Sequence, residues 1–295
     1  MSAISVFWSP AYNATDDDFD TLSKADLVAR IVKEKGVAGV RCRRPEAVGV
    51  EALEEVHSGA YVDAVRSGEP RWLAGSNGLT WCRGLFDAVR ASTGGMVAAA
   101  LAALEHGTAG SLSSGLHHAR REEGKGYCTF NGLVIAALAA VVAGAARVLI
   151  LDLDAHCGGG TASLIDGVDG IEQVDVAVNP FDHYESRPDA RLVMADGGDY
   201  LDVVERELRR IASPGSIDLV LYNAGMDPHE RAGGVAGIDT ATLAEREEVV
   251  FQWASTHGLP VAFALAGGYQ GAGFDLVDVA RLHLLTVETA ARWSR

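Results

Sequence analysis

The apolar run from Val148 to Leu151 leads directly into two carboxylates and an imidazole, and this junction restricts the fold more than any other part of the sequence. A continuous apolar run of this kind is typical of a strand buried on both faces of a parallel sheet. A bare carboxylate there would be costly to desolvate, so Asp154 and His156 are expected where they meet a cation or hydrogen-bond donors. While the chain stays extended both side chains share one face, where they can bind one metal ion together. A capping aspartate and an exposed histidine would give the same local pattern.

Three other apolar runs also end in polar groups. Residues 217–223 lead to Asp227, residues 261–265 lead to Tyr269, and residues 109–113 lead to His117 and His118. In open parallel sheets, ligand sites gather outside the carboxyl ends of the strands, so these side chains are expected on one rim. Two carboxylates and one imidazole leave a divalent ion with an open coordination position, which is typical of a catalytic rather than a structural metal site.

These motifs resemble, in their order and approximate spacing, those of the histone deacetylase and acetylpolyamine amidohydrolase family of zinc hydrolases, which have the arginase-like α/β fold. The matching motifs are Gly115–Ala119, Gly126–Asn131, Asp152–His156, Ala224–Asp227 and Ala266–Tyr269. Weaker similarity extends back through residues 84–87 and 56–61.

The resemblance implies a role for each of these residues. The implied metal ligands, for Zn²⁺ or alternatively Fe²⁺ or Co²⁺, are Asp154, His156 and Asp227. The implied catalytic groups are the paired histidines His117 and His118, the hydroxyl of Tyr269, and Asp152, which would hydrogen-bond His117 and share in a site for a monovalent cation such as K⁺. The implied substrate-binding residues are Gly126, Tyr127 and Gly268.

The chemistry of amide hydrolysis requires groups of these types. A divalent ion acidifies bound water and polarises the scissile carbonyl. A neutral imidazole can accept the proton of water, and an imidazolium can deliver one to the leaving amine. A tyrosine hydroxyl placed opposite the metal would stabilise the developing oxyanion.

The chain departs from the family pattern at three places. Gly159 stands where many relatives carry Asp or Asn, so we expect His118 to be less basic and less firmly held unless another group substitutes, and His117 with Asp152 to deliver more of the protons. Cys157 follows a metal ligand directly and is expected to be a small packed thiol. No acid stands near residues 77–78, where many lysine deacetylases hold a peptide backbone, which favours a small-molecule substrate over a protein.

Strand-like and helix-like segments alternate along the chain, which predicts a three-layer α/β fold with a mostly parallel sheet covered by helices on both faces. The predicted strands are 3–8, 37–42, 109–113, 147–153, 174–179, 217–223 and 261–265. The predicted helices are 20–35, 50–66, 93–106, 131–145, 198–212, 240–257 and 275–292. Because the site motifs span most of the chain, we expect residues 1–295 to form a single catalytic domain.

Two long stretches, 67–92 and 180–197, are predicted to be rim loops, and loops of that length are commonly functional. Their aromatic side chains could line a channel mouth or pack as ordinary loop residues: Trp72, Trp81, Phe181 and Tyr184.

Composition limits the partners. The net charge of -15 argues against nucleic acid and anionic membranes and is compatible with a cationic amine substrate or product. Four cysteines without C-x-x-C spacing, and a start at residues 1–8 without a basic segment or long apolar core, predict a cytoplasmic protein. The apolar run 132–146 is too short for a comfortable bilayer crossing and predicts a buried helix. The sequence leaves open whether the chain forms a homo-oligomer.

Three functions from different classes are compatible with the sequence. The first is a zinc-dependent amidohydrolase that removes an acyl group, acetyl above all, from acyl-lysine, an acylpolyamine or an acylated small molecule. The second is an arginase-type ureohydrolase, which would need a further aspartate in a D-A-H-x-D run where this chain has Cys157 and Gly158. The third is a catalytically silent binding protein on the same fold, which Gly159 supports best and the full set of ligands and histidines opposes.

Overall fold

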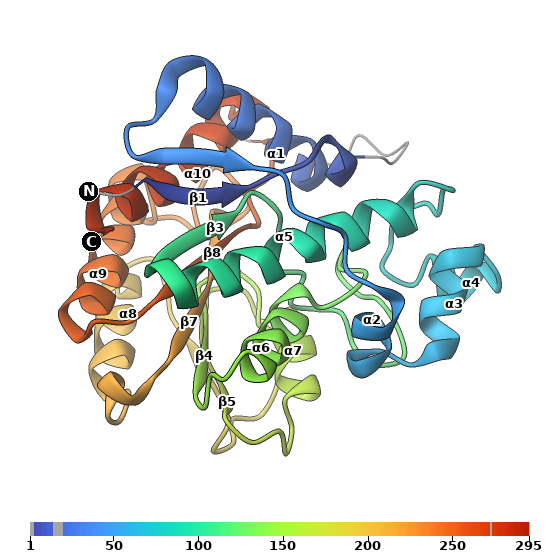
Figure 1. The fold of residues 1–295 in the computed structure, drawn as a ribbon. Coiled ribbons are helices and arrows are strands. Elements are labelled where there is room, and N and C mark those ends of the chain that lie inside the picture. The colour runs from blue at the N-terminus through green and yellow to red at the C-terminus, as the bar shows by residue number, and fades with distance from the viewer. Residues whose placement is uncertain (1–2, 14–19, 272, 295) are drawn as a thin grey trace.

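A parallel β-sheet runs through the molecule (Figure 1). The computed structural model describes residues 3–13, 20–271 and 273–294. In these ranges the sheet has eight strands in the order β2-β1-β3-β8-β7-β4-β5-β6. The strands are β1 (Ile4–Phe7), β2 (Val40–Arg43), β3 (Thr108–Ser111), β4 (Val148–Asp152), β5 (Ile171–Ala177), β6 (Ala190–Met194), β7 (Leu219–Gly225) and β8 (Val261–Ala266). All neighbouring strands pair in parallel, so the predicted α/β class with a parallel sheet is confirmed.

The central strands are buried along their whole length. Every residue of β4, β7 and β8 is buried, as expected for apolar runs covered on both faces. The edge strand β2 instead alternates between partly buried and exposed residues. The carboxyl ends of β3, β8, β7 and β4, which are neighbours in the sheet, therefore bring the four predicted motifs to one rim.

Helices cover both faces of the sheet (Figure 1). One face packs against α1 (Asp20–Ile31), α8 (Tyr200–Arg210), α9 (Thr240–His257) and α10 (Leu276–Trp293). The other packs against α2 (Val50–Val56), α3 (Gly59–Ser67), α5 (Leu85–His106) and α6 (Gly132–Val142). The remaining short helices are α4 (Arg71–Ala74), α7 (Gly159–Leu164), the 3-10 turns Pro10–Asn13 and Pro214–Ser216, and a π-helical turn at Val32–Gly36 that continues α1.

The predicted helix 50–66 and the predicted loop 67–92 were both wrong in detail. The helix is broken at His57 and Ser58, where the Ser58 side chain caps α3 by accepting a hydrogen bond from Tyr61 N. The loop contains α4 and the first two turns of α5, which begins at Leu85 rather than residue 93.

The second predicted loop, 180–197, contains the edge strand β6. This strand escaped prediction because it is short and only partly buried, so it lacks the apolar run of the central strands. Helix α7 escaped prediction because it begins in consecutive glycines, which have low helix propensity.

The apolar segment at 132–146 forms α6, a helix of 11 residues that is buried on one side against α5, as predicted. Within the ranges that the structure describes, no helix combines the length and apolar character needed to cross a bilayer.

Candidate active site

The three predicted metal ligands converge at the carboxyl ends of β4 and β7. Candidate ligand atoms of Asp154, His156 and Asp227 all lie within 4.8 Å of one another. Nδ1 of His156 is 3.1 Å from Oδ1 of Asp154 and 3.1 Å from Oδ2 of Asp227. Both aspartates are buried and the imidazole is partly buried. The structure therefore brings together the ligand set expected from the sequence.

The backbone fixes this arrangement. The amide N–H groups of Ala155 and His156 donate to Oδ1 of Asp227 and Oδ1 of Asp154, each at 3.0 Å. Gly267, at the end of β8, has φ +51°, and a Cβ on it would lie 2.2 Å from the Asp227 carboxyl carbon. A larger residue at 267 would displace Asp227, so the AGGY segment helps to shape the metal site.

The two carboxylates of the site attract positive charge. Although burial opposes it, the neighbouring carboxylates of Asp154 and Asp227 raise the pKa of His156 to about 11. Burial and the neighbouring charge of Asp154 raise the pKa of Asp227. Oδ2 of Asp227 is buried and accepts no hydrogen bond of normal geometry from the described residues. The buried carboxylates of Asp154 and Asp227, one of which has an oxygen without a hydrogen-bond partner among the described residues, are suitable ligands for a divalent ion.

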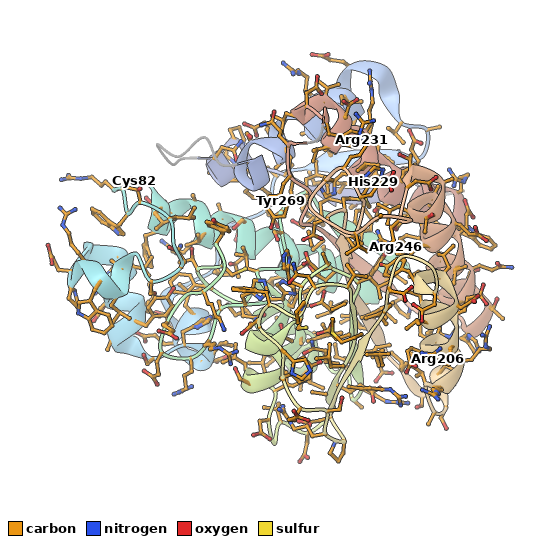
Figure 2. The ribbon with its side chains drawn as sticks, turned by 180° about the vertical axis from the view of Figure 1, so that it is seen from behind. Cys82, Arg206, His229, Arg231, Arg246 and Tyr269 are labelled. Atoms are coloured by element: carbon orange, nitrogen blue, oxygen red, sulfur yellow. The ribbon has the colours of Figure 1, made fainter. Side chains whose placement is uncertain are left out.

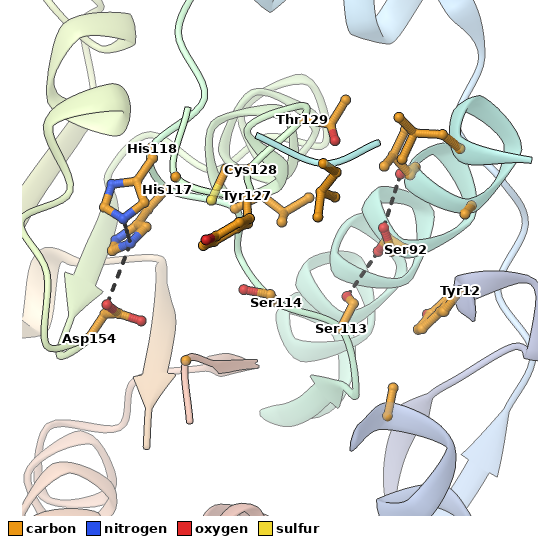
Figure 3. A pocket seen from close by; sticks show the side chains of 18 of the residues that line it. Tyr12, Ser92, Ser113, Ser114, His117, His118, Tyr127, Cys128, Thr129 and Asp154 are labelled. Carbon is orange, nitrogen blue, oxygen red and sulfur yellow. Dashed lines mark hydrogen bonds and ion pairs between the residues drawn. The ribbon is translucent and has the colours of Figure 1, made fainter. Parts of the chain in front are cut away.

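His117 and His118 lie beside the metal ligands (Figure 3). Nδ1 of His117 is 2.7 Å from Oδ2 of Asp152, and the Nε2 atoms of the two histidines are 3.0 Å apart. Asp152 is held by Asn223 Nδ2, which donates to its Oδ1 at 2.8 Å. Although burial opposes it, Asp152 and Asp154 raise the pKa of His117 to about 10. Asp152 therefore lies where the family resemblance implies, hydrogen-bonded to a cationic His117.

Another group substitutes for the carboxylate that position 159 lacks, which is the exception that the prediction for His118 left open. Nδ1 of His118 lies 3.1 Å from Oδ2 of Asp182, which comes from the connection between β5 and β6. The other carboxylate oxygen, Oδ1, accepts from Arg120 Nη2 and Lys125 Nζ, each at 2.5 Å. His118 is nonetheless neutral, because burial and then the charge of His117 lower its pKa to about 4 against the effect of Asp182.

Tyr269 follows β8 and is partly buried beside the metal site. Its ring packs on Gly233, where a Cβ would lie 2.8 Å from Cδ2 of the tyrosine. Burial and then the charge of Asp227 raise the pKa of Tyr269 well above its usual range, so its hydroxyl stays protonated. Gly267 lines the cavity, whereas a Cβ on Gly268 would face Val279, His283 and Met226 in the interior.

A cavity leads from the metal site into the protein. Gly126 and Tyr127 are among the residues that line it, and Tyr127 is 45% exposed; their role in substrate binding stays a prediction. Its inner part was not predicted, because it is formed by ordinary helix and strand residues without a recognisable motif. These inner residues include Tyr12, Leu85, Val89, Ser92, Ser113 and Ser114 (Figure 3).

Of the four loop aromatics, Phe181 alone contacts the histidines. Its ring lies edge-on to those of His118 and His156, at 5.0 Å and 5.9 Å between centroids. Trp72 is 73% exposed, Trp81 donates from Nε1 to Val65 O, and Tyr184 is partly buried against the core.

Two buried side chains, Arg246 and Cys157, pack next to the segments that carry the metal ligands. The buried Arg246 of α9 donates from Nη1 to the carbonyls of Leu153 and Gly225, on the two segments that carry the metal ligands (Figure 2). The Cys157 thiol is fully buried, 3.4 Å from Asn179 O, as predicted for a packed side chain.

Comparison with known proteins agrees with the geometry. The sequence pattern of the histone deacetylase domain matches residues 20–184. An uncharacterized protein from Picosynechococcus sp. is 36% identical over 234 residues, covering 76% of this chain and 77% of that protein. A probable deacetylase from Methanothermobacter thermautotrophicus is 25% identical over 305 residues, covering 93% of this chain and 88% of that protein.

Histone deacetylase 2 from Arabidopsis thaliana is 30% identical over 189 residues, which are 61% of this chain and 49% of that protein. Among solved structures, the HDA15 HD domain has the same fold, with a TM-score of 0.79 and 20% identity over 100% of this chain and 91% of that chain. On the match to the domain pattern and the 36% identical relative, the chain belongs to the histone deacetylase family.

Proposed function

We propose that this protein is a metal-dependent amidohydrolase that removes an acyl group, acetyl above all, from an amine. The observation that carries the proposal is the convergence of Asp154, His156 and Asp227 beside the paired histidines at one end of a cavity. Membership of the histone deacetylase family supports the same reaction class.

The donor set favours one divalent ion. Two carboxylates and one imidazole would hold Zn²⁺ with coordination positions left for ligands from outside the protein. Carboxylate-rich ligation also suits Fe²⁺ or Co²⁺. When bound, the ion would lower the pKa of water and polarise the carbonyl of the scissile amide. By resemblance, Asp152 would also contribute to a site for a monovalent cation such as K⁺.

The two histidines are suited to opposite proton transfers. Neutral His118, whose Nδ1–H donates to Asp182, has its lone pair on Nε2, where it accepts from protonated His117 at 3.0 Å; with substrate bound, the same lone pair can instead accept a proton from the attacking water. His117 carries a proton and is oriented by Asp152, so it can protonate the amine nitrogen as the C–N bond breaks. This division gives His117 the proton delivery expected from the sequence, but it rests on the opposite charges of the two imidazoles and not on a missing carboxylate beside His118, which Asp182 supplies.

Tyr269 would complete the site. Its protonated hydroxyl, presented beside the metal ligands, can donate to the oxygen of the scissile carbonyl as negative charge develops there. This is the role that the resemblance implies for the residue.

The substrate is an acylated amine, for which a small molecule is favoured over a protein. Asn77, near the position where lysine deacetylases use a rim acid, is buried and donates to Thr129 Oγ1 instead of facing a ligand. The net charge of -15 suits a cationic amine product.

A substrate panel tests the proposal. Metal-loaded protein is mixed with acetylated peptides, acetylated polyamines, N-acyl amino compounds and guanidino compounds, and released amine, acetate and urea are measured. We expect amine and acetate in equal amounts from at least one acylated substrate. Urea release would support the ureohydrolase alternative, and no turnover with a full metal site would support a silent binding protein.

A further inference from the structure

The connection between β5 and β6 supplies a carboxylate that helix α7 does not carry. Asp182 is 7% exposed, and its Oδ2 accepts from His118 Nδ1 and from Gly160 N, each at 3.1 Å. We infer that Asp182 is the positioning residue of His118, and that glycine at 159 is required because it leaves the space that Asp182 occupies. The inference rests on the proposed function.

The Asp182 carboxylate cannot turn freely. Oδ1 binds the guanidinium of Arg120 and the ammonium of Lys125, while Oδ2 faces the imidazole of His118. Although burial opposes it, hydrogen bonds from His118 and Lys125 lower the pKa of Asp182, so the group is an anion. An anion held by two cations on one oxygen presents the other oxygen to His118 in a single orientation.

This orientation selects one form of the neutral imidazole. A carboxylate oxygen at 3.1 Å accepts from an N–H on Nδ1, which leaves Nε2 of His118 without a proton. Nε2 is the atom that faces His117 and the cavity. Asp182 thus keeps the lone pair of His118 on the side where substrate would bind.

The space at residue 159 is closed by the backbone of Asp182. A Cβ on Gly159 would lie 2.2 Å from the Asp182 carbonyl oxygen and 3.1 Å from Nη2 of Arg120. The first contact is with backbone, and the segment that carries Asp182 is also held by Cys157 N, just before α7, which donates to Phe181 O at 3.0 Å. A side chain at 159 and the present position of Asp182 therefore exclude each other.

A double-mutant cycle tests the inference. Asp182→Ala removes the carboxylate, and Gly159→Ala adds one methyl group that must displace the same segment. With the metal-loaded protein, each is expected to lower kcat by about 10- to 100-fold, by analogy with the loss of the hydrogen-bond partner of a metal-ligating histidine. KM and metal content should stay within about twofold, and the double variant should be no worse than either single variant because both act through one contact. Gly215→Ala, at a glycine with nothing within 4 Å of its Cβ, is the control for the added methyl group.

A second measurement separates this inference from the proposed function. The ¹⁵N NMR shifts of His118 should report a proton on Nδ1 in the wild type and a mixture of tautomers in Asp182→Ala, whether or not a substrate has been found. The inference is overturned if both single variants keep the wild-type kcat, if their losses add in the double variant, or if the His118 tautomer is the same in wild type and Asp182→Ala. Absence of amide hydrolysis by the wild type, with the tautomer change present, would contradict the proposed function alone.

Discussion

Tyr269 is the residue of the site whose truncation removes one hydroxyl and neither a metal ligand nor a charge. If the hydroxyl stabilises the transition state, Tyr269→Phe should lower kcat by about 10² or more while metal content and KM change little. Steady-state kinetics with parallel metal analysis would measure this separation.

The control for that variant is Tyr184→Phe, which removes a tyrosine hydroxyl near Asp175, outside the lining of the cavity. It should keep the wild-type kcat. Wild-type turnover in Tyr269→Phe would make Tyr269 a wall residue and remove it from the catalytic set.

Some residues of the site could be predicted because the strand that positions them and the functional side chains lie close together in the sequence. Asp154 and His156 follow a buried strand within a few positions, so the apolar run and the ligands are visible together in the sequence. Asp182 could not be found in this way, because it is 64 positions from His118 and meets it only after the sheet has formed. The only sign of Asp182 in the sequence was indirect, because Gly159 lacks the carboxylate that would hydrogen-bond His118 in many relatives.

At the scale of elements, helix α9 stabilises the ends of β4 and β7, after which the metal ligands follow. Arg246 and Glu247 are both fully buried and paired, and Tyr222 donates to the same Glu247 oxygen. Arg246→Met would leave that carboxylate buried without its cation, so the free energy of unfolding should fall by about 3–5 kcal/mol. Urea denaturation of the metal-loaded protein measures the change.

Arg209→Met is the matched control, because the ion pair of Arg209 with Glu205 on α8 is exposed and should contribute less than about 1 kcal/mol. Replacing both buried partners, in Arg246→Met with Glu247→Leu, should recover much of the stability. A single Arg246→Met variant as stable as the control would show that the buried pair does not hold the strand ends.

The predicted and observed element bounds agree best for the strands that are completely buried. Strands β4, β7 and β8 lie where their apolar runs predicted, within about two residues at each end. Strand β6 was not predicted because an edge strand needs fewer apolar residues. Helix α5 begins before residue 93 because its first two turns also pack into the core, through Leu85, Phe86 and Val89.

At the scale of the whole molecule, pH acts on stability through buried histidines such as His57. Its Nδ1 faces Arg120 O at 2.7 Å and its Nε2 accepts from Asn131 N at 2.9 Å, so Nε2 has no room for a proton. Burial lowers the pKa of His57 from 6.5 to about 4. Between these values the unfolded chain binds the additional proton, so stability should fall with falling pH by up to about 1.4 kcal/mol per pH unit for this residue.

Comparing urea unfolding at several pH values between 4 and 7 isolates this contribution. His57→Gln should be less stable near neutrality and show a shallower loss of stability toward low pH than the wild type. His106→Gln, on the exposed end of α5, should keep the wild-type slope. Equal slopes in all three proteins would mean that His57 is not held neutral in the folded state.

We propose that one divalent ion at Asp154, His156 and Asp227 makes this chain an amidohydrolase. The most direct measurement adds Zn²⁺ stepwise to metal-free protein and follows hydrolysis of the best substrate of the panel. We expect activity to rise linearly and to reach its plateau at one equivalent per chain, and Asp227→Ala to bind little metal and show no turnover. Full activity in metal-free protein, a requirement for two equivalents, or an Asp227→Ala variant with a full equivalent of metal and normal turnover would contradict a single catalytic ion at these three residues.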